Sequence, residues 1–247
     1  MTKNSVHRVA IVTGGSKGIG AATAQRLASD GYAVVVNYAH DAEVAEAAVQ
    51  SITDNGGTAV AIQADVADER AVVDLFNDTA TRFGGVDVLV HSAGRMDLGS
   101  LVEFDLDILD DMHRSNIRGF FVVAQRAARR LRPGGALIGL SSSVTSSQLP
   151  RYAAYAATKG AMEAATLILA RELRGRDVTV NTVAPGPTAT SLFLDGKTEE
   201  ELDHFAKIPP LERLGRPEDI ADTIAFLASP AGHWVNGQVI RANGGAI

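Results

Sequence analysis

Short β-branched runs alternate with longer helical patterns along most of this chain. The run RVAIVT (Arg8–Thr13) is apolar through its centre without alternation, which is typical of a parallel strand buried on both faces. The next segment, IGAATAQRLASDG (Ile19–Gly31), has small and apolar residues at helical spacing and ends in glycine. Repetition of this unit predicts an α/β fold with a parallel sheet and helices on both faces. Further strands are predicted at 33–38, 58–65, 86–94, 136–141, 177–184 and 238–241. Further helices are predicted at 41–57, 69–83, 106–131 with a break near 115, after the serine-rich segment to about 174, 199–206 and 217–228.

Length and composition narrow the function classes. The 247 residues show no linker-like shift in composition, so we expect one domain over 1–247, with an irregular loop or lid at about 186–216. A formal net charge of −6 without a Lys/Arg block argues against a nucleic-acid partner. The absence of cysteine excludes disulfides and thiolate metal sites and suits the cytoplasm, and the histidines lack ligand spacing, so no metal is expected. We expect neither a signal peptide nor a membrane span.

A glycine-rich turn, TGGSKGIG (Thr13–Gly20), joins the first strand to the first helix. Glycines at such a turn let the backbone approach a pyrophosphate, and the helix N-terminus favours anions. The spacing Gly14-x-x-x-Gly18-x-Gly20 differs from the GxGxxG dinucleotide fingerprint, so a tight turn without a ligand is the alternative. The candidate cofactor-binding residues here are Gly14, Ser16, Lys17, Gly18, Ile19 and Gly20.

The end of the second strand bears on which dinucleotide would bind. An acidic residue there would accept a hydrogen bond from the adenosine ribose 2′-OH of NAD. The chain instead has Asn37, Tyr38 and His40, with no carboxylate before Asp41, and Lys17 stands in the glycine turn. A cation without a nearby acid favours a 2′-phosphate, so we expect NADP(H) over NAD(H). Lys17 as an ordinary surface lysine remains the alternative.

A serine-rich segment, SSSVTSSQLPRYAAYAATK (141–159), precedes a predicted helix. Tyr155 and Lys159 are four residues apart and therefore share a helix face, whereas Tyr152 is matched by Ala156. A nearby ammonium group lowers the pKa of a phenol, which would suit Tyr155 to proton transfer. A chance Tyr–Lys pair is the alternative, and the spacing does not choose among the serines.

Taken together, these motifs resemble the short-chain dehydrogenase/reductase family, in its bacterial 3-oxoacyl-[acyl-carrier-protein] reductase-like branch. The resemblance rests on TGGSKGIG, QADVAD, SAG at 92–94, SNIRG, YAATK, NTVAPG, RLGRPEDIA and NGQVIRANGG, in this order. It implies a Rossmann-type doubly wound sheet of about seven strands. It also implies catalytic roles for four residues: Tyr155 as general acid, Ser142, thirteen positions earlier, on the substrate oxygen, Lys159 on the nicotinamide ribose, and Asn116 holding a relay water.

The same resemblance implies further cofactor contacts and a homotetramer. The family usually has Asn-Asn-Ala-Gly where this chain has His91-Ser92-Ala93-Gly94, so His91 would either replace hydrogen bonds between strands or alter the cofactor fit. The implied cofactor contacts, besides Tyr155 and Lys159, are Asp65, Val66, Ser92, Ala93, Gly94, Pro185, Gly186, Thr188 and Thr190. On residue type alone, Asp65 would be a turn or capping aspartate.

The leading function is therefore an NADP(H)-dependent oxidoreductase that interconverts a ketone and a secondary alcohol. A catalytically idle NADP-binding scaffold and an NAD-dependent alcohol dehydrogenase are the alternatives. The acidic Glu199–Glu201 and Asp203 do not favour docking of an acidic carrier protein on the predicted lid. Apolar residues predicted near the substrate are Leu149, Pro150, Tyr152, Leu192, Phe193, Leu194 and Phe205, although these side chains could simply cover the core.

Overall fold

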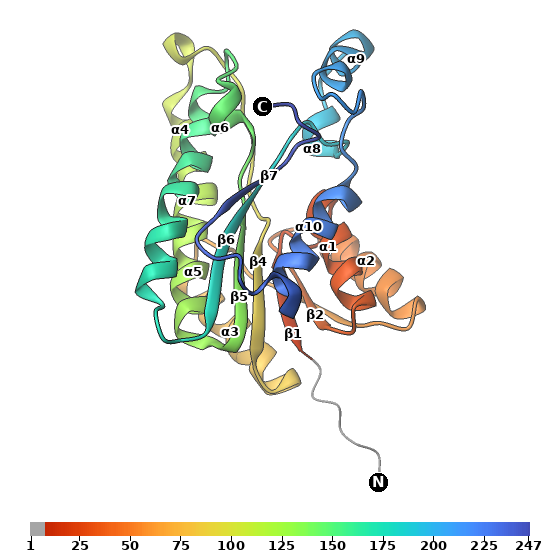
Figure 1. The fold of residues 1–247 in the computed structure, drawn as a ribbon, viewed down its shortest axis with the longest axis vertical. Coiled ribbons are helices and arrows are strands. Elements are labelled where there is room, and N and C mark those ends of the chain that lie inside the picture. The colour runs from red at the N-terminus through yellow and green to blue at the C-terminus, as the bar shows by residue number, and fades with distance from the viewer. Residues whose placement is uncertain (1–7) are drawn as a thin grey trace.

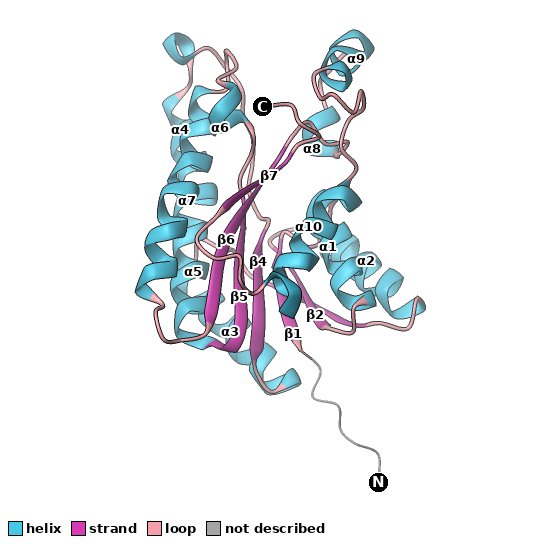
Figure 2. Cartoon of the chain, in the orientation of Figure 1, coloured by secondary structure: helices cyan, strands magenta, loops and turns pink. Residues whose placement is uncertain are grey.

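Seven parallel strands form one sheet in the computed structural model, which describes residues 8–247 (Figures 1 and 2). His7, one of the histidines considered above as metal ligands, lies outside the described residues. The order across the sheet is β3-β2-β1-β4-β5-β6-β7. The strands are β1 (Val9–Thr13), β2 (Ala33–Tyr38), β3 (Thr58–Gln63), β4 (Val86–His91), β5 (Leu131–Leu140), β6 (Val178–Pro185) and β7 (Val239–Ala242). The predicted doubly wound α/β fold is confirmed.

The continuous apolar strands are buried because helices cover both faces of the sheet. In β1, Ala10 and Val12 pack toward one face, while Ile11 packs toward the other. Figure 1 shows α1, α2 and α10 on one side, and α5 and α7 on the other. The helices are α1 (Gly18–Ser29), α2 (Ala42–Asp54), α3 (Glu69–Phe83), α4 (Leu106–Met112), α5 (Gly119–Arg130), α6 (Val144–Ser147), α7 (Ala153–Glu172), α8 (Ser191–Leu194), α9 (Glu199–Lys207) and α10 (Pro217–Ala228).

Two segments differ from the sequence-based expectation in a way that matters locally. The helix predicted at 106–131 with a break near Ser115 is divided into α4 and α5 by a π-helical turn, His113–Arg118. Such turns insert one residue into the helical ladder and are frequent at functional sites. Strand β5 begins at Leu131, before the RPGG expected to be a turn, and this segment forms an irregularity in the pairing with β4.

The carboxyl ends of the strands meet at one edge of the sheet, which is where open α/β sheets bind ligands. The strand order reverses between β1 and β4, because β2 lies on one side of β1 and β4 on the other. The turns after β1, β4, β5 and β6 therefore converge beside this switch point. Among residues 8–247, no helix is long and apolar enough to cross a membrane.

Candidate active site

Two adjoining cavities open at this edge of the sheet. The glycine-turn cavity lies over the ends of β1, β2 and β4, and the tyrosine cavity lies between the end of β5, α7 and the segment 185–208. They form one continuous cleft, since Ile19, Ser92, Gly94, Leu140 and Thr190 belong to the walls of both. Most of the surface that lines the tyrosine cavity is apolar, as is usual for a site that takes an organic ligand.

The turn after β1 is built by close backbone contacts. Gly14 has a φ of +61°, and a Cβ there would lie 2.9 Å from the Ala93 backbone. Helix α1 begins at Gly18, so its free N–H groups are presented to the glycine-turn cavity. Gly20 lies outside the cavity lining, where a Cβ would meet the Gly14 carbonyl oxygen. The predicted residues that do line this cavity are Gly14, Ser16, Lys17, Gly18 and Ile19.

The serines at the end of β5 have different hydrogen-bond partners. Ser141 is buried, and its hydroxyl donates to Glu163 Oε1 at 2.6 Å. Ser143 is also buried, and its hydroxyl donates to the Ala184 carbonyl oxygen. Ser142 lines the tyrosine cavity with Tyr155, and its hydroxyl oxygen accepts the Val144 N–H at 3.3 Å. Its hydroxyl proton is therefore not committed to the partners that hold Ser141 and Ser143, which is consistent with the choice of Ser142 by the family interval.

Tyr155 lies in the first turn of α7 and is 8% exposed. Burial raises the pKa of its phenol above the ordinary value, and the nearby Ser142 hydroxyl opposes this rise. The phenol is therefore protonated at neutral pH. Tyr152 is only half-buried and lines the outer part of the cavity.

Lys159 lies one turn beyond Tyr155 and is 5% exposed. Its Nζ donates to the Leu140 carbonyl oxygen at 2.7 Å and lies 5.6 Å from the centre of the Tyr155 ring. Burial lowers the pKa of Lys159 to about 8. The lowering of the Tyr155 pKa by Lys159 stays a prediction, since burial dominates the phenol in the free protein. A Cβ at Gly94 would lie 3.6 Å from Lys159 Nζ, so glycine keeps the approach to the ammonium open.

Asn116 lies in the π-helical turn and is 1% exposed. Its side-chain oxygen accepts the Arg95 N–H, and its amide donates to the Arg95 carbonyl oxygen and to Thr158 Oγ1. The side chain thus fastens the turn after β4 to α7. The inserted residue of the π-turn sets Asn116 in this position, behind the tyrosine cavity.

Residues predicted to contact adenosine line the glycine-turn cavity and also serve the fold. The Asn37 amide donates to the Ile62 and Ala64 carbonyl oxygens. Asp65 accepts the Ala67 N–H, as its turn role predicts, and its second oxygen pairs with Arg114 at 2.7 Å. Burial acts to raise the pKa of Asp65, but these two partners hold it below its ordinary value. The predicted residues brought together at this end are Asn37, Tyr38, His40, Asp65, Val66, Ser92, Ala93 and Gly94.

The segment after β6 forms the other wall of the cleft. A Cβ at Gly186 would lie 2.9 Å from Asn243, so the absence of a side chain at Gly186 lets the loop pack closely against the chain after β7. Thr188 pairs with Gly215 through an isolated parallel β-bridge, so the two ends of the 186–216 loop are joined. The predicted Pro185, Gly186, Thr188 and Thr190 all line the tyrosine cavity. So do Leu149, Tyr152, Leu192, Phe193 and Phe205, whereas Pro150 lines only an adjoining pocket and Leu194 faces elsewhere.

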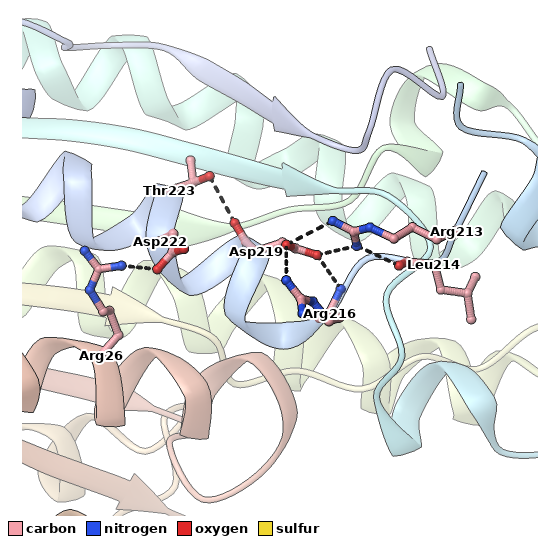
Figure 3. Close-up of polar contacts among 7 residues, drawn as sticks. All are labelled: Arg26, Arg213, Leu214, Arg216, Asp219, Asp222 and Thr223. Atoms are coloured by element: carbon pink, nitrogen blue, oxygen red, sulfur yellow. Dashed lines mark hydrogen bonds and ion pairs between the residues drawn. The ribbon is translucent and has the colours of Figure 1, made fainter. Parts of the chain in front are cut away.

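An ion-pair cluster anchors the far end of this loop (Figure 3). The Asp219 carboxylate lies between the guanidinium groups of Arg213 and Arg216 and also accepts the Arg216 N–H at 2.7 Å. Hydrogen bonding with Arg213 is the largest influence, and the pKa of Asp219 falls to about 2. A second ion pair, Arg26 with Asp222, joins α1 to α10. These ion pairs hold the carboxyl-terminal end of the 186–216 loop at the start of α10.

Three charged residues that the motif analysis did not assign also contribute to the site. Glu163 accepts from Ser141 and Thr145 and so supports the segment that carries Ser142. Its position four residues after Lys159, on the same helix face, is a signal that the sequence does contain. Asp41 and Arg114 pair with Lys17 and Asp65, respectively, from separate elements, and the sequence gives no sign of these pairings.

His91 is fully buried and forms part of the sheet. Thr13 Oγ1 accepts the Ala93 N–H at 3.3 Å and lies 3.0 Å from His91 Nδ1. Thr13 Oγ1 and His91 Nδ1 thus share one hydrogen bond between β1 and β4, and His91 Nε2 meets no hydrogen-bond partner within the described residues. His91 therefore replaces a hydrogen bond between strands, the first of the two expected alternatives.

Acid sensitivity should follow from this burial. Burial, reinforced by the charge of Lys159, lowers the pKa of His91 from 6.5 to about 3. Below pH 6.5 the unfolded chain takes up a proton that the folded protein does not, so this contribution to stability is complete above pH 6.5 and is lost as the pH falls toward 3. We expect His91 to remove up to about 1.4 kcal/mol of unfolding free energy per pH unit in this range. Chemical denaturation of wild type and His91→Asn at pH 7.5, 6 and 5 measures the difference, and parallel pH dependences would contradict it.

Comparison with known proteins agrees with this architecture. The family model described as Enoyl-(Acyl carrier protein) reductase matches residues 14–246. A "Short-chain type dehydrogenase/reductase" of Picea abies is 42% identical, over 97% of this chain and 92% of that protein. Versicolorin reductase stcU of Emericella nidulans is 41% identical, over 97% and 96%. The crystal structure of a short-chain dehydrogenase from Burkholderia cenocepacia in complex with NADP superposes with a TM-score of 0.90, at 40% identity and 98% coverage of each chain.

Proposed function

Because this chain belongs to the short-chain dehydrogenase/reductase family, we propose that it reduces a ketone to a secondary alcohol with NADPH, and catalyses the reverse reaction with NADP⁺. The observation that carries the proposal is that Ser142 and Tyr155 lie together on the wall of a largely apolar cavity, with the buried Lys159 one helical turn from Tyr155. The family relatives named as reductases and the relative solved with NADP support the reaction class and the cofactor.

The residues of the cleft fit a dinucleotide. The glycine turn and the first N–H groups of α1 suit a pyrophosphate, and the glycine-turn cavity extends from them to the end of β2. Gly94 leaves space beside Lys159 and Asn116 that a Cβ would fill. When bound, NADPH supplies the hydride for the substrate carbonyl carbon.

Tyr155 supplies the proton in this proposal. Burial keeps its phenol protonated, so Oη can donate to the carbonyl oxygen as negative charge develops there. The Ser142 hydroxyl, which already meets Tyr155, would donate to the same oxygen and hold the substrate in line. The reverse reaction uses the same contact, with Tyr155 accepting the alcohol proton.

Lys159 and Asn116 are proposed to support this transfer. The Lys159 ammonium would bind the nicotinamide ribose hydroxyls and stabilise the phenolate left on Tyr155. Asn116, held by Arg95 and Thr158, would position a water behind Lys159 through its backbone carbonyl. This relay would return a proton from solvent to Tyr155.

The lid (residues 186–216) is proposed to cover an apolar, aromatic part of the substrate. The rings of Phe193 and Phe205 pack edge to face with their centres 5.2 Å apart, and both line the tyrosine cavity together with Tyr152. The cationic Arg95 in this wall is paired with Asp97 and Asp111, so it offers little to an anionic substrate. A free aromatic or alicyclic ketone therefore fits this cavity better than a ketoacyl group on an acidic carrier.

Turnover of a carbonyl panel tests the proposal directly. Purified protein would be mixed with NADPH and simple aliphatic ketones, bicyclic aromatic ketones, quinones and a ketoacyl thioester, and loss of NADPH absorbance would be followed. We expect the bicyclic aromatic ketones to be the best substrates. Absence of turnover with every compound, together with intact NADPH binding, would favour the catalytically idle scaffold instead.

A homotetramer is part of the proposal because two exposed faces carry large apolar side chains. Trp234, which is 98% exposed, precedes the edge strand β7, and Val239 on β7 and Phe226 on α10 are also exposed. The second face includes Phe121 on α5 and Ile168 on α7. Such exposed side chains are typical of surfaces that pack against another protein.

Trp234→Glu should therefore reduce the assembly below four copies of the 25.9 kDa chain, because it places a charge in the proposed contact. Light scattering coupled to size-exclusion chromatography measures the mass. Val102→Glu, at a residue that is 90% exposed in the turn Leu101–Glu103 and outside the elements that carry the two faces, is the control and should leave the mass unchanged. An identical mass for Trp234→Glu and wild type would contradict the proposed β7 contact.

A further inference from the structure

Lys17, the cation of the glycine turn, is held by a carboxylate in the free protein. Its ammonium forms an ion pair with Asp41, and both side chains are about half exposed, at 54% and 55%. Asp41 is the residue before α2, where an aspartate usually accepts N–H groups of its own helix. Among the hydrogen bonds of residues 8–247, none joins the first N–H groups of α2 to this carboxylate. Asp41 is instead directed at Lys17.

The other cations around the glycine-turn cavity are paired as well. Arg114 binds Asp65, and Arg95 binds Asp97 and Asp111. Every lysine and arginine among the described residues of this lining therefore already has a carboxylate partner. An incoming 2′-phosphate thus meets a cavity whose positive charges are largely neutralised.

We propose that Asp41 is a specificity-determining residue that competes with the adenosine 2′-phosphate for Lys17. This inference rests on the NADP(H) assignment in the proposed function. Binding of NADPH would exchange one anionic partner of Lys17 for another, whereas binding of NADH requires no such exchange. Asp41 therefore reduces the preference for NADPH below the value that Lys17 alone would give.

The geometry permits this exchange. An exposed ion pair contributes little, and a phosphate brings nearly two charges and three acceptor oxygens to the same ammonium. Once released, the Asp41 carboxylate stands at the N-terminus of α2, where N–H groups are available to it. Asp41 thus has a second position to occupy when Lys17 turns to the phosphate.

Asp41→Asn separates the charge from the capping ability, because asparagine and aspartate are equally good N-caps. We expect the NADPH dissociation constant of this variant to fall about twofold to fivefold at low ionic strength. The NADH dissociation constant should not change. The gain in NADPH affinity should shrink in 0.5 M salt, where the Debye length is on the order of 4 Å and exposed charges are therefore screened. Nucleotide fluorescence with the purified full chain measures both constants without any substrate.

Asp30→Asn is the matched control. Asp30 follows the last residue of α1, pairs with Arg26 and lies at the opposite end of the helix from Lys17. This variant makes the same change in net charge about 18 Å away along the helix. It should leave both dissociation constants at the wild-type values.

A double variant tests whether the effect passes through Lys17. In the Lys17→Ala background, Asp41→Asn should give no gain in NADPH affinity. The proposal is overturned if Asp41→Asn does not tighten NADPH binding, if Asp30→Asn tightens it equally, or if the gain persists without Lys17. A variant that only weakens NADH binding would also overturn it, since Asp41 would then be a ribose-hydroxyl acceptor. Wild-type protein that binds neither dinucleotide would instead overturn the proposed function itself.

Discussion

Tyr155→Phe is expected to lower kcat for ketone reduction by about 10³-fold, in the middle of the range for a lost general acid. The phenylalanine ring fills the same buried space, so the fold and the cleft should persist. The NADPH dissociation constant should stay within about twofold of wild type, because the proposed cofactor contacts of the glycine turn are untouched. Initial rates at saturating NADPH, together with a fluorescence titration of the nucleotide, separate the two effects.

Tyr152→Phe is the matched control for this experiment. Tyr152 carries the same hydroxyl, lines the same cavity and precedes Tyr155 by three residues. It should retain kcat within about fivefold of wild type, well short of the loss of a general acid. A Tyr155→Phe enzyme with a tenth or more of wild-type kcat, or an equal loss in both variants, would show that the proton comes from elsewhere.

Lys159→Met should lower kcat/KM for NADPH by about 10²-fold, since the buried ammonium is proposed to bind the ribose and stabilise the phenolate. Methionine is similar in length and removes only the charged, hydrogen-bonding end. The effect should differ from that of Tyr155→Phe in raising the NADPH dissociation constant as well. The exposed Lys207, which pairs with Asp203, provides the control variant Lys207→Met with wild-type kinetics.

The pH profile gives a second readout of Lys159. Burial lowers its pKa to about 8, so the ammonium is present below pH 8 and is lost as the pH rises through this value. The kcat/KM for NADPH in the reduction direction should therefore decline above about pH 8, because this parameter reports the free enzyme. This decline should be absent in Lys159→Met. If Lys159→Met shows the same decline above about pH 8, the decline must come from the titration of another group.

Regular periodicity allowed the sheet and most helices to be predicted from the sequence. Apolar runs buried on both faces, such as β1, and helices with marked ends, such as α10 after Pro217, leave little ambiguity. The π-helical turn around Asn116 could be anticipated only as a break, because one inserted residue changes the spacing too little to identify its type. The irregular start of β5 was missed because RPGG is typical of a turn.

Parts of the candidate site depend on contacts between distant segments. Helical spacing separates Tyr155 from Tyr152, but it cannot choose Ser142 from its neighbours. The structure supplies a physical reason for that choice, because the hydroxyl groups of Ser141 and Ser143 donate hydrogen bonds to Glu163 and to the Ala184 carbonyl oxygen, respectively. The Lys17–Asp41 and Asp65–Arg114 pairs likewise join residues 24 and 49 positions apart, and local patterns carry no information about them.

The β-bridge between Thr188 and Gly215 allows the sequence of the lid to vary independently of the rest of the fold. Its two ends are joined to each other, and Asp219 fixes the chain that leaves it. Length and composition between these points can therefore vary with little strain on β6 or α10, since loop closure costs rise only slowly with length. Substitutions within the lid can in this way reshape the tyrosine cavity while the residues proposed for hydride and proton transfer stay in place.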